Sequence, residues 1–382
     1  MKKSHLSLDG RARENVVRCP DPVQVVVPLR GHSTKTVKKK AQVVPGSLIA
    51  EHPAKSIGDA HASISGIVTE VSARGVAIQA QDVDAASEPV PRQDLKSRLK
   101  SLGISTRAFL PAQTLVVNGL NPEPGTTIAA YLLEHRAPQV AEGLGAVKRL
   151  TGATSCTLVS SRKDGFTLEG CTGVRVDGVY PNSIHPLVIK AATGKELPDE
   201  TLCVDVHTLF QIGWALETGM PVTEVLVSVG DTIVQAKVGQ PVMDILQAAG
   251  VSVDDGDTVV FGGPMRGQAL ASPETGLPKD AFALTVVPAG EFARPTTQAC
   301  LNCGCCVAHC PARIRPNMIG RFTEFQFYDR TREYGIDHCL ECGLCTYWCT
   351  SRRPVLQYIR LARQELAARE EQVTSCTLNE QE

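Results

Sequence analysis

The sequence predicts a multidomain protein of mixed α/β and α+β class. Three observations lead to this prediction. Short apolar runs separated by turn residues fill residues 23–88, a strand–helix–strand order follows over residues 97–220, and eight cysteines in two groups of four lie within 50 residues near the C-terminus. Each of these patterns is typical of a different kind of domain.

Composition and charge exclude several functional classes. The 382 residues include 39 Lys and Arg against 40 Asp and Glu, so the formal net charge is −1. That balance gives no electrostatic case for binding nucleic acid. The N-terminus is polar, and no apolar run reaches the ~18–20 residues that a membrane-spanning helix needs. We therefore expect a soluble or peripheral protein on the cytoplasmic side.

The first part of the chain predicts an arm followed by a small all-β domain. Residues 1–22 are mostly polar and are expected to form the arm. Strand-like runs punctuated by Gly and Pro fill residues 23–88. The basic run at residues 35–40 is interpreted as a solvated loop, with a docking patch as the alternative. The polar, acidic stretch 82–96 is predicted to be a linker.

Residues 97–220 predict an α/β domain with a parallel sheet. Thr114–Asn118 is an apolar strand, and a Gly- and Pro-rich turn follows it. A long helical stretch is expected over residues 126–150, with a break near Pro138 because proline disrupts a helix interior. Cys156–Ser160 then forms the next strand. A strand–helix–strand order is typical of parallel sheets.

Residues 221–292 predict a compact α+β module of the β-grasp kind. Glu224–Val229 and Thr232–Val238 alternate like paired strands around a Gly-Asp turn. Pro241–Ala249 is expected to be a short helix, with Pro at its start and Gly just past its end. A further strand is expected at Asp257–Phe261.

Two cysteine motifs near the C-terminus carry the strongest functional signal. Residues 300–310 and 339–349 share the spacing C-x2-C-x2-C-x3-C. Three Cys separated by two residues each let one loop wrap three corners of a [4Fe–4S] cube. The fourth Cys points away and ligates the cluster of the other motif, as in two-cluster ferredoxins. We therefore predict a dicluster domain at residues 293–370, followed by a tail at 371–382.

The predicted metal ligands follow from this crossed arrangement. Zinc sites are the alternative, but zinc usually draws on separated C-x2–4-C pairs rather than on three Cys within seven residues. Cys305 does not fit the spacing and is interpreted as a small neighbour of a cluster rather than a ligand. The predicted ligands are Cys300, Cys303, Cys306 and Cys349 for the first cluster, and Cys339, Cys342, Cys345 and Cys310 for the second.

The cysteines outside the two motifs show no pairing pattern, and a disulfide framework is not expected in a chain of this length.

Two helices are expected around the second motif. One spans roughly Asn317–Arg330, and the other follows Pro354, where apolar residues recur on one face. That face is expected to pack on the cluster domain, with docking of a partner as the alternative. Its residues are Val355, Ile359, Ala362 and Leu366.

This order of domains resembles the RnfC family, the C component of Rnf-type ion-translocating electron transport complexes, over about residues 22–370. Related chains include the flavin-bearing subunit of respiratory complex I and cobalamin reductases. Residues 25–29, 46–51 and 61–66 look like the family's lipoyl-like domain, and residues 262–267 resemble its GGPMMG turn. The resemblance implies a barrel-sandwich β unit, a Rossmann-like α/β domain, a β-grasp (SLBB-like) module and an α-helical ferredoxin-like domain for two [4Fe–4S] clusters.

The departures from the family concern its flavin site. The family binds FMN and NADH at a loop of the form GxGGAGFPT, and residues 102–111 keep only one of its glycines. Asn121 replaces the first acidic residue of the motif NxxExEP. His185 and His207 fall in two further cofactor-contacting segments and are interpreted as structural. The resemblance therefore implies a kept fold with a degenerate FMN/NADH site; a reshaped flavin site is the alternative.

The leading functional hypothesis is an electron-transfer subunit that relays electrons through two [4Fe–4S] clusters. The resemblance implies the peripheral RnfC component of an Rnf-type complex at the cytoplasmic face of the cell membrane. Its expected partners are integral membrane and iron–sulfur subunits and an electron donor protein. One alternative is a flavin-dependent NADH or corrinoid oxidoreductase, and another is a soluble dicluster adaptor. No catalytic residue is predicted, because no Ser/His/Asp or Cys/His constellation stands out.

Overall fold

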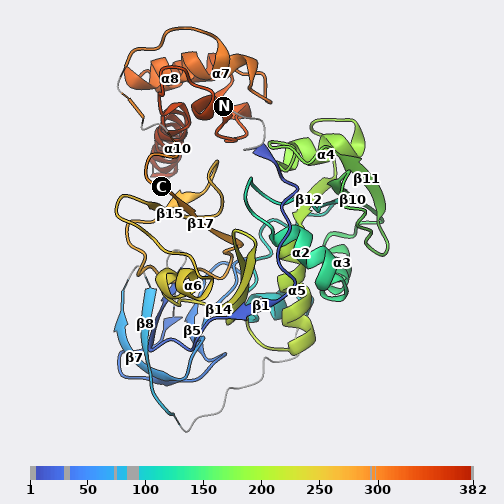
Figure 1. Cartoon of the computed structure of the whole chain (residues 1–382), viewed down its shortest axis with the longest axis vertical. Helices are drawn as coiled ribbons and strands as arrows, with labels where there is room; N and C mark the ends of the chain where they lie inside the picture. The colour runs from blue at the N-terminus through green and yellow to red at the C-terminus, as the bar shows by residue number, and fades with distance from the viewer. Residues whose placement is uncertain are drawn as a thin grey trace. The chain divides into compact units, whose positions relative to one another are not determined.

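The computed structural model describes residues 6–29, 35–72, 75–83, 94–292, 295–296 and 298–379, without the side chains of residues 35, 36 and 371–379. The chain divides into two compact units, residues 1–287 and 288–382. In Figure 1 the first unit, coloured from blue to brown-yellow, is built around sheets, whereas the second, in orange and red, is helical. Most of the predicted linker falls outside the described residues.

The first unit contains two small sheets within the predicted all-β domain. Their strands are β2 (Gln24–Pro28), β3 (Lys35–Thr36), β4 (Gln42–Val43), β5 (Leu48–Glu51), β6 (Ala60–His61), β7 (Gly66–Val71) and β8 (Gly75–Ala80). One sheet has the order β2-β8-β7-β4 and the other β3-β5-β6. Alternate residues such as Val25 and Val27 are buried, as expected for strands with one face on a core.

A four-stranded parallel sheet follows, as predicted. Its strands are β9 (Thr114–Asn118), β10 (Ser155–Ser161), β11 (Thr172–Val176) and β12 (Thr201–Asp205). They lie in the order β11-β10-β9-β12, and each neighbouring pair is parallel. The carboxyl ends of all four strands therefore meet at one edge, where open α/β sheets bind their ligands.

Helices surround this sheet (Figure 1). They are α1 (Leu95–Ser101), α2 (Ile128–His135), α3 (Ala137–Thr151), α4 (His185–Thr193) and α5 (Val206–Thr218). The predicted break near Pro138 is confirmed, since α2 ends at His135 and Pro138 lies in the first turn of α3. Helix α1 starts inside the predicted linker 82–96, because the Asp94 carboxylate accepts from the Lys96 and Ser97 N–H groups and caps it.

A six-stranded sheet completes the first unit. It contains β1 (Val16–Arg18), β13 (Glu224–Val229), β14 (Thr232–Lys237), β15 (Thr258–Phe261), β16 (Gln268–Ala269) and β17 (Ala283–Val287), with helix α6 (Val242–Ala248). The order is β1-β14-β13-β17-β15-β16. The expected hairpin, helix and strand of residues 221–292 are all present. Strand β1 comes from the stretch predicted as an arm and pairs in parallel with β14.

One disulfide, between Cys156 and Cys171, joins the start of β10 to the residue before β11, with the two Cα atoms 4.6 Å apart. The sequence shows no pairing pattern for these two cysteines. The pairing of β10 with β11 brings them together, because Thr157 lies opposite Thr172 in the register. No disulfide framework is expected from the sequence of this chain, and this one bond is a departure from that expectation.

The second unit is made of short helices around one long helix. They are α7 (Cys305–Ala308), α8 (Pro316–Glu324), the 3-10 helices η2 (Tyr328–Tyr334) and η3 (Ile336–His338), α9 (Leu344–Tyr347) and α10 (Val355–Asn379). The apolar face predicted after Pro354 is confirmed as a packing face. Its four residues are buried in a core with Ile319 and Ile336.

Two boundaries in this unit differ from the prediction. The helix expected at Asn317–Arg330 is wrong in its C-terminal part: α8 ends at Glu324 and η2 follows, because Gln326 takes a left-handed φ of 61° that no helix can include. The backbone predicted as a tail from residue 371 continues α10 to Asn379. Across the described part of the chain, no helix combines the length and the apolar character needed to cross a membrane.

Candidate metal centre

The two cysteine motifs share one backbone conformation. Gly304 and Gly343 both have φ of 78° and precede the short helices α7 and α9. Asn302 and Glu341 share the left-handed region, with φ of 52° and 50°. The N–H of each donates to the cysteine sulfur two positions earlier, at 3.4 Å. The motifs therefore repeat in geometry as well as in spacing.

The four thiols predicted for the first cluster line one cavity of the second unit. Cys300, Cys303 and Cys306 come from the first motif, and Cys349 comes from the second. Residues from the start of α8 and α10 complete the wall. Cys300 and Cys303 are exposed, so this set lies at the surface of the unit.

The four thiols predicted for the second cluster lie deeper. Cys342 and Cys345 are buried, and Cys339 and Cys310 are half-buried. Burial raises the pKa of Cys342 to about 11, and the charges of Cys310 and Cys339 add to this effect. Cys310, from the first motif, is thus an electrostatic neighbour of the second motif's thiols. Because metal ligands must be thiolates, binding at this set releases protons.

Hydrogen-bond donors surround the sulfurs of the first set. The N–H of Asn317, in the first turn of α8, donates to the Cys306 sulfur. The N–H of Arg353 donates to Cys349 Sγ at 3.3 Å. Such donors stabilise negative charge on a thiolate.

Two aromatic rings connect the motifs. His309 and Trp348 each immediately precede the fourth cysteine of their motif, and their rings stack with centroids 4.3 Å apart and planes 18° apart. Tyr347 packs edge-on against Trp348 at 5.3 Å. This stack therefore packs the turn after α7 against the turn after α9, at the same position in each cysteine motif.

The donor set fits a pair of [4Fe–4S] clusters. Each predicted set supplies the four thiols that such a cluster needs, three from one motif and one from the other as in two-cluster ferredoxins, and backbone N–H groups donate to several of the sulfurs. Cys305 is absent from the cavity wall and instead hydrogen-bonds Cys303, in keeping with a neighbour rather than a ligand. Among the described residues, no three His, Cys, Asp or Glu side chains stand ready to hold a single metal ion.

In the first unit, polar side chains gather at the carboxyl edge of the parallel sheet. Asn118 Nδ2, at the end of β9, donates to Asp205 Oδ1 at 2.8 Å, and His185 Nε2 lies 2.9 Å from Asp205 Oδ2. Burial alone would raise the pKa of Asp205, but the charge and hydrogen bond of His185 hold it well below its usual range. The His207 ring packs against Phe282 at 5.4 Å. Both histidines therefore have structural partners.

Asn121 binds the N-terminal segment. Its Nδ2 donates to the carbonyl oxygens of Leu8 and Gly10, both at 2.9 Å. Its Oδ1 accepts from the N–H groups of Ala129 and Ala130 at the start of α2. A glutamate at this position, as in the family motif, has no N–H to donate to the two carbonyls.

The N-terminal segment, residues 6–13, lies along this edge of the sheet. Leu6 and Leu8 are buried. The Ser161 hydroxyl, at the end of β10, donates to the Asp9 carboxylate at 2.5 Å. The stretch predicted as an arm thus contacts the residues at the ends of the strands, where a ligand of this fold would bind.

The remaining family positions are also engaged within the chain. The Glu123 carboxylate is 2% exposed and accepts from the N–H groups of Met265 and Arg266 at 2.7 and 3.0 Å. In the loop 102–111, the N–H of Thr106 donates to the Ser56 carbonyl at 2.8 Å. This loop therefore packs on the β domain, and Glu123 anchors the turn at residues 262–267.

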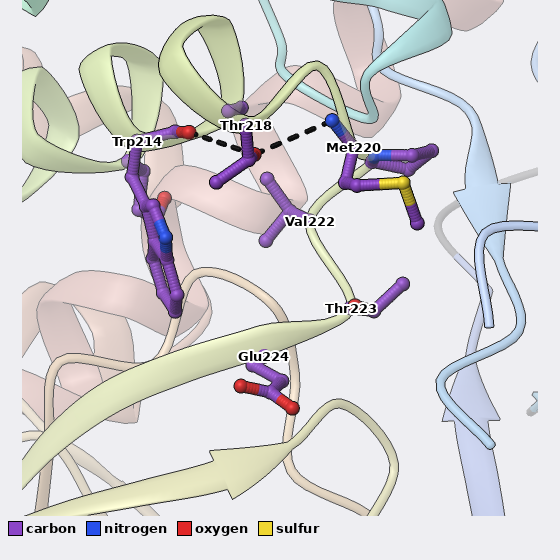
Figure 2. Close-up of a pocket in the computed structure, with 9 residues that line it drawn as sticks. Trp214, Thr218, Met220, Val222, Thr223 and Glu224 are labelled. Atoms are coloured by element: carbon purple, nitrogen blue, oxygen red, sulfur yellow. Dashed lines mark hydrogen bonds between the residues drawn. The ribbon is translucent and has the colours of Figure 1, made fainter. Parts of the chain in front are cut away.

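A separate pocket lies where α5 ends and β13 begins (Figure 2). Trp214, Met220 and Val222 supply much of its apolar lining. The Thr218 hydroxyl donates to the Trp214 carbonyl at 2.9 Å and fixes the end of the helix. The Glu224 carboxylate on its wall is paired with Lys237 at 2.5 Å. None of the predicted ligands or flavin-site positions lines it.

Comparison with known proteins shows that the chain is similar to components of ion-translocating oxidoreductases. More particularly, its curated relatives are named as the C component of such complexes. The Rhodobacter capsulatus protein is 25% identical over 92% of this chain and 79% of its own length. The C component of the proton-translocating ferredoxin:NAD(+) oxidoreductase complex of Clostridium ljungdahlii is 23% identical over 93% and 90%. The predicted resemblance to the RnfC family is confirmed by the names of these relatives.

The C component of the Na(+)-translocating ferredoxin:NAD(+) oxidoreductase complex of Acetobacterium woodii is likewise 23% identical, over 91% of this chain and 92% of its own. No protein-family profile matches the chain. A solved NAD+-reducing [NiFe]-hydrogenase shares 16% identity over 68% of this chain and 56% of its own, with a TM-score of 0.42.

Sequence reasoning missed two features near the candidate sites. The Thr350 hydroxyl lies 3.2 Å from Cys303 Sγ, and the only sequence signal for it is the absence of the proline that follows the fourth cysteine of the first motif. The Asp205 carboxylate pairs with the His185 ring at 2.9 Å, and the sequence gives no sign of this pairing.

Proposed function

We propose that this chain is the electron-transfer subunit that relays electrons through two [4Fe–4S] clusters in an Rnf-type ion-translocating complex. The observation that carries the proposal is the crossed cysteine arrangement, in which Cys349 joins the first motif's thiols and Cys310 neighbours those of the second. The names of the relatives support the same class of complex.

Each bound cluster would supply a centre that takes up and releases one electron. The chain's own residues hold and tune these centres. Four thiolates bind each cluster, the buried Cys342 and Cys345 keep water from the second, and backbone N–H groups at residues such as Asn317 and Arg353 offset negative charge at the first.

The proposed partners follow from the relatives. As the C component of such a complex, the chain would dock on integral membrane and iron–sulfur subunits at the cytoplasmic face of the membrane and receive electrons from a donor protein. An electron carrier without a substrate site needs a macromolecular partner at both ends.

We further propose that FMN is not bound. Asn121 donates to Leu8 and Gly10, so the N-terminal segment covers the sheet edge at which the family's cofactor would sit. Acid extraction of purified protein should release no flavin fluorescence, and the protein should not oxidise NADH. One equivalent of FMN per chain would revive the flavoenzyme alternative.

Iron and sulfide analysis of anaerobically purified protein tests the cluster assignment. Two cubes predict about eight iron and eight sulfide per chain. Cys349→Ala should remove the electron paramagnetic resonance (EPR) signal of the cluster held by the first motif, and Cys310→Ala that of the cluster held by the second. The opposite pairing would overturn the crossed ligands, and stoichiometric zinc without sulfide would overturn the iron–sulfur proposal.

A further inference from the structure

The two cysteine motifs differ immediately after their fourth cysteine. Pro311 follows Cys310, whereas Thr350 follows Cys349. Proline carries neither a hydroxyl nor a backbone N–H, so it can donate no hydrogen bond. Any hydrogen bond that Thr350 makes through its hydroxyl is therefore specific to one half of the repeat.

The Thr350 hydroxyl faces a thiol of the other motif. Its Oγ1 lies 3.2 Å from Cys303 Sγ, within hydrogen-bond distance for sulfur. A thiolate that binds iron has no proton, so in the loaded protein only the hydroxyl can donate. Cys303 also receives a hydrogen bond from the backbone of Cys305, the counterpart of the bond from Leu344 to Cys342. The backbone donor to the second cysteine is thus the same in the two motifs, and the Thr350 hydroxyl adds a donor at Cys303 that Pro311 cannot supply in the other motif.

We infer that Thr350 raises the reduction potential of the cluster at Cys300, Cys303, Cys306 and Cys349 above that of the other cluster. The inference rests on the proposed function. Reduction adds one electron to the cluster and makes or breaks no bond, so the reduced centre carries one more negative charge. A hydroxyl that donates to a ligand sulfur stabilises that charge, and hydrogen bonds to the sulfurs are among the factors that set cluster potentials.

The solvent exposure of the thiols should also raise the reduction potential of the first cluster relative to the second. Cys300 and Cys303 are exposed, whereas Cys342 and Cys345 are buried. Solvent stabilises the additional charge of a reduced cluster, so the surface set favours the electron. An electron shared by the two centres would therefore reside mainly at the first.

An anaerobic redox titration followed by EPR tests the inference in the full-length, cluster-loaded protein. Thr350→Val keeps the shape of the side chain but removes the donor. It should lower the potential of the first cluster by about 59 mV, a tenfold change in a one-electron equilibrium, and leave the second unchanged. Thr350→Ser keeps the hydroxyl and should retain the wild-type potential.

Thr296→Val is the matched control. The Thr296 hydroxyl donates to the Ser351 carbonyl at 2.8 Å, next to Thr350 but not to a sulfur. Its loss should leave both potentials unchanged. If Thr350→Val loses iron, Thr350→Ala provides the same comparison.

The outcomes separate this inference from the proposed function. Equal first-cluster potentials in wild type and Thr350→Val, with eight iron in both, would overturn the role of Thr350 alone. A wild-type first cluster with the lower potential of the two would overturn the order of the clusters. Wild-type protein without iron and sulfide would overturn the proposed function itself.

Discussion

His61 shows how burial sets the behaviour of a single side chain. It ends β6 and is 7% exposed. Burial, together with the charges of Lys279 and Lys100, lowers the pKa of His61 to about 3, although a hydrogen bond with the backbone of Asp59 acts in the opposite direction. The ring is therefore neutral in the folded protein at pH values where an exposed histidine is charged.

This shift predicts a loss of stability in mild acid. Between pH 6.5 and about 3, the unfolded chain binds a proton at His61 that the folded chain does not. The free energy of unfolding should fall as the pH decreases, with a contribution of about 1.4 kcal/mol per pH unit. Urea unfolding at pH 7.5, 6.5 and 5.5 should show a shallower slope for His61→Gln than for wild type. Identical slopes would contradict the assignment.

At the scale of elements, the packing of α3 against α5 depends on glycine. Helices α3 and α5 cross at Gly143 and Gly213. A Cβ at Gly143 would lie 1.9 Å from the Leu209 carbonyl oxygen, and one at Gly213 would lie 1.9 Å from that of Gln139. Backbones can approach this closely only where no side chain separates them.

Gly143→Ala should therefore destabilise the first unit by about 1–3 kcal/mol, the usual cost of overpacking a core. Gly145, two positions along the same helix, is the matched control. The nearest atom to its Cβ would be the flexible Arg149 guanidinium at 3.6 Å. Gly145→Ala should be neutral or stabilise by up to about 1 kcal/mol, because alanine favours a helix. Equal effects in thermal unfolding would mean that the helices do not cross so closely.

At the scale of the whole molecule, the regions predicted separately in the first unit share their cores. Val25 and Val27 of β2 lie in one buried cluster with Val225 and Val227 of β13. Ile233 of β14 lies in the core of the parallel sheet. Removing residues 1–88 would therefore expose the cores of the remaining regions. The loss of membrane attachment by such a truncated protein would not show that residues 1–88 form the docking surface.

Attachment to a membrane is better tested with the intact protein. If the chain is a peripheral component of an Rnf-type complex, it should follow the membrane fraction of native cells. It should leave the membrane in a carbonate wash without detergent, because protein contacts rather than an inserted helix would hold it. Recovery only in the soluble fraction, with no membrane subunit cross-linked to it, would favour the soluble adaptor.

Local patterns account for much of what the sequence predicts correctly. The break between α2 and α3 follows from Pro138, and the β13–β14 hairpin follows from alternating residues around its turn. The two four-cysteine motifs, and the glycines that shape them, are also readable because chain spacing alone sets which thiols one loop can present. The predicted boundaries of helices are wrong where a single residue takes a non-helical backbone conformation, as Gln326 does just after α8.

The sequence by itself determined the order of the elements, the two cysteine motifs and the departures from the flavin-binding pattern, because each depends on residues close together in the chain. Only the tertiary structure decided that residues 6–13 cover the carboxyl edge of the parallel sheet, that Cys156 meets Cys171, and that Thr350 faces Cys303. Those contacts join residues between 15 and 152 positions apart. Their geometry depends on how strands and helices pack, which no local pattern of residues encodes.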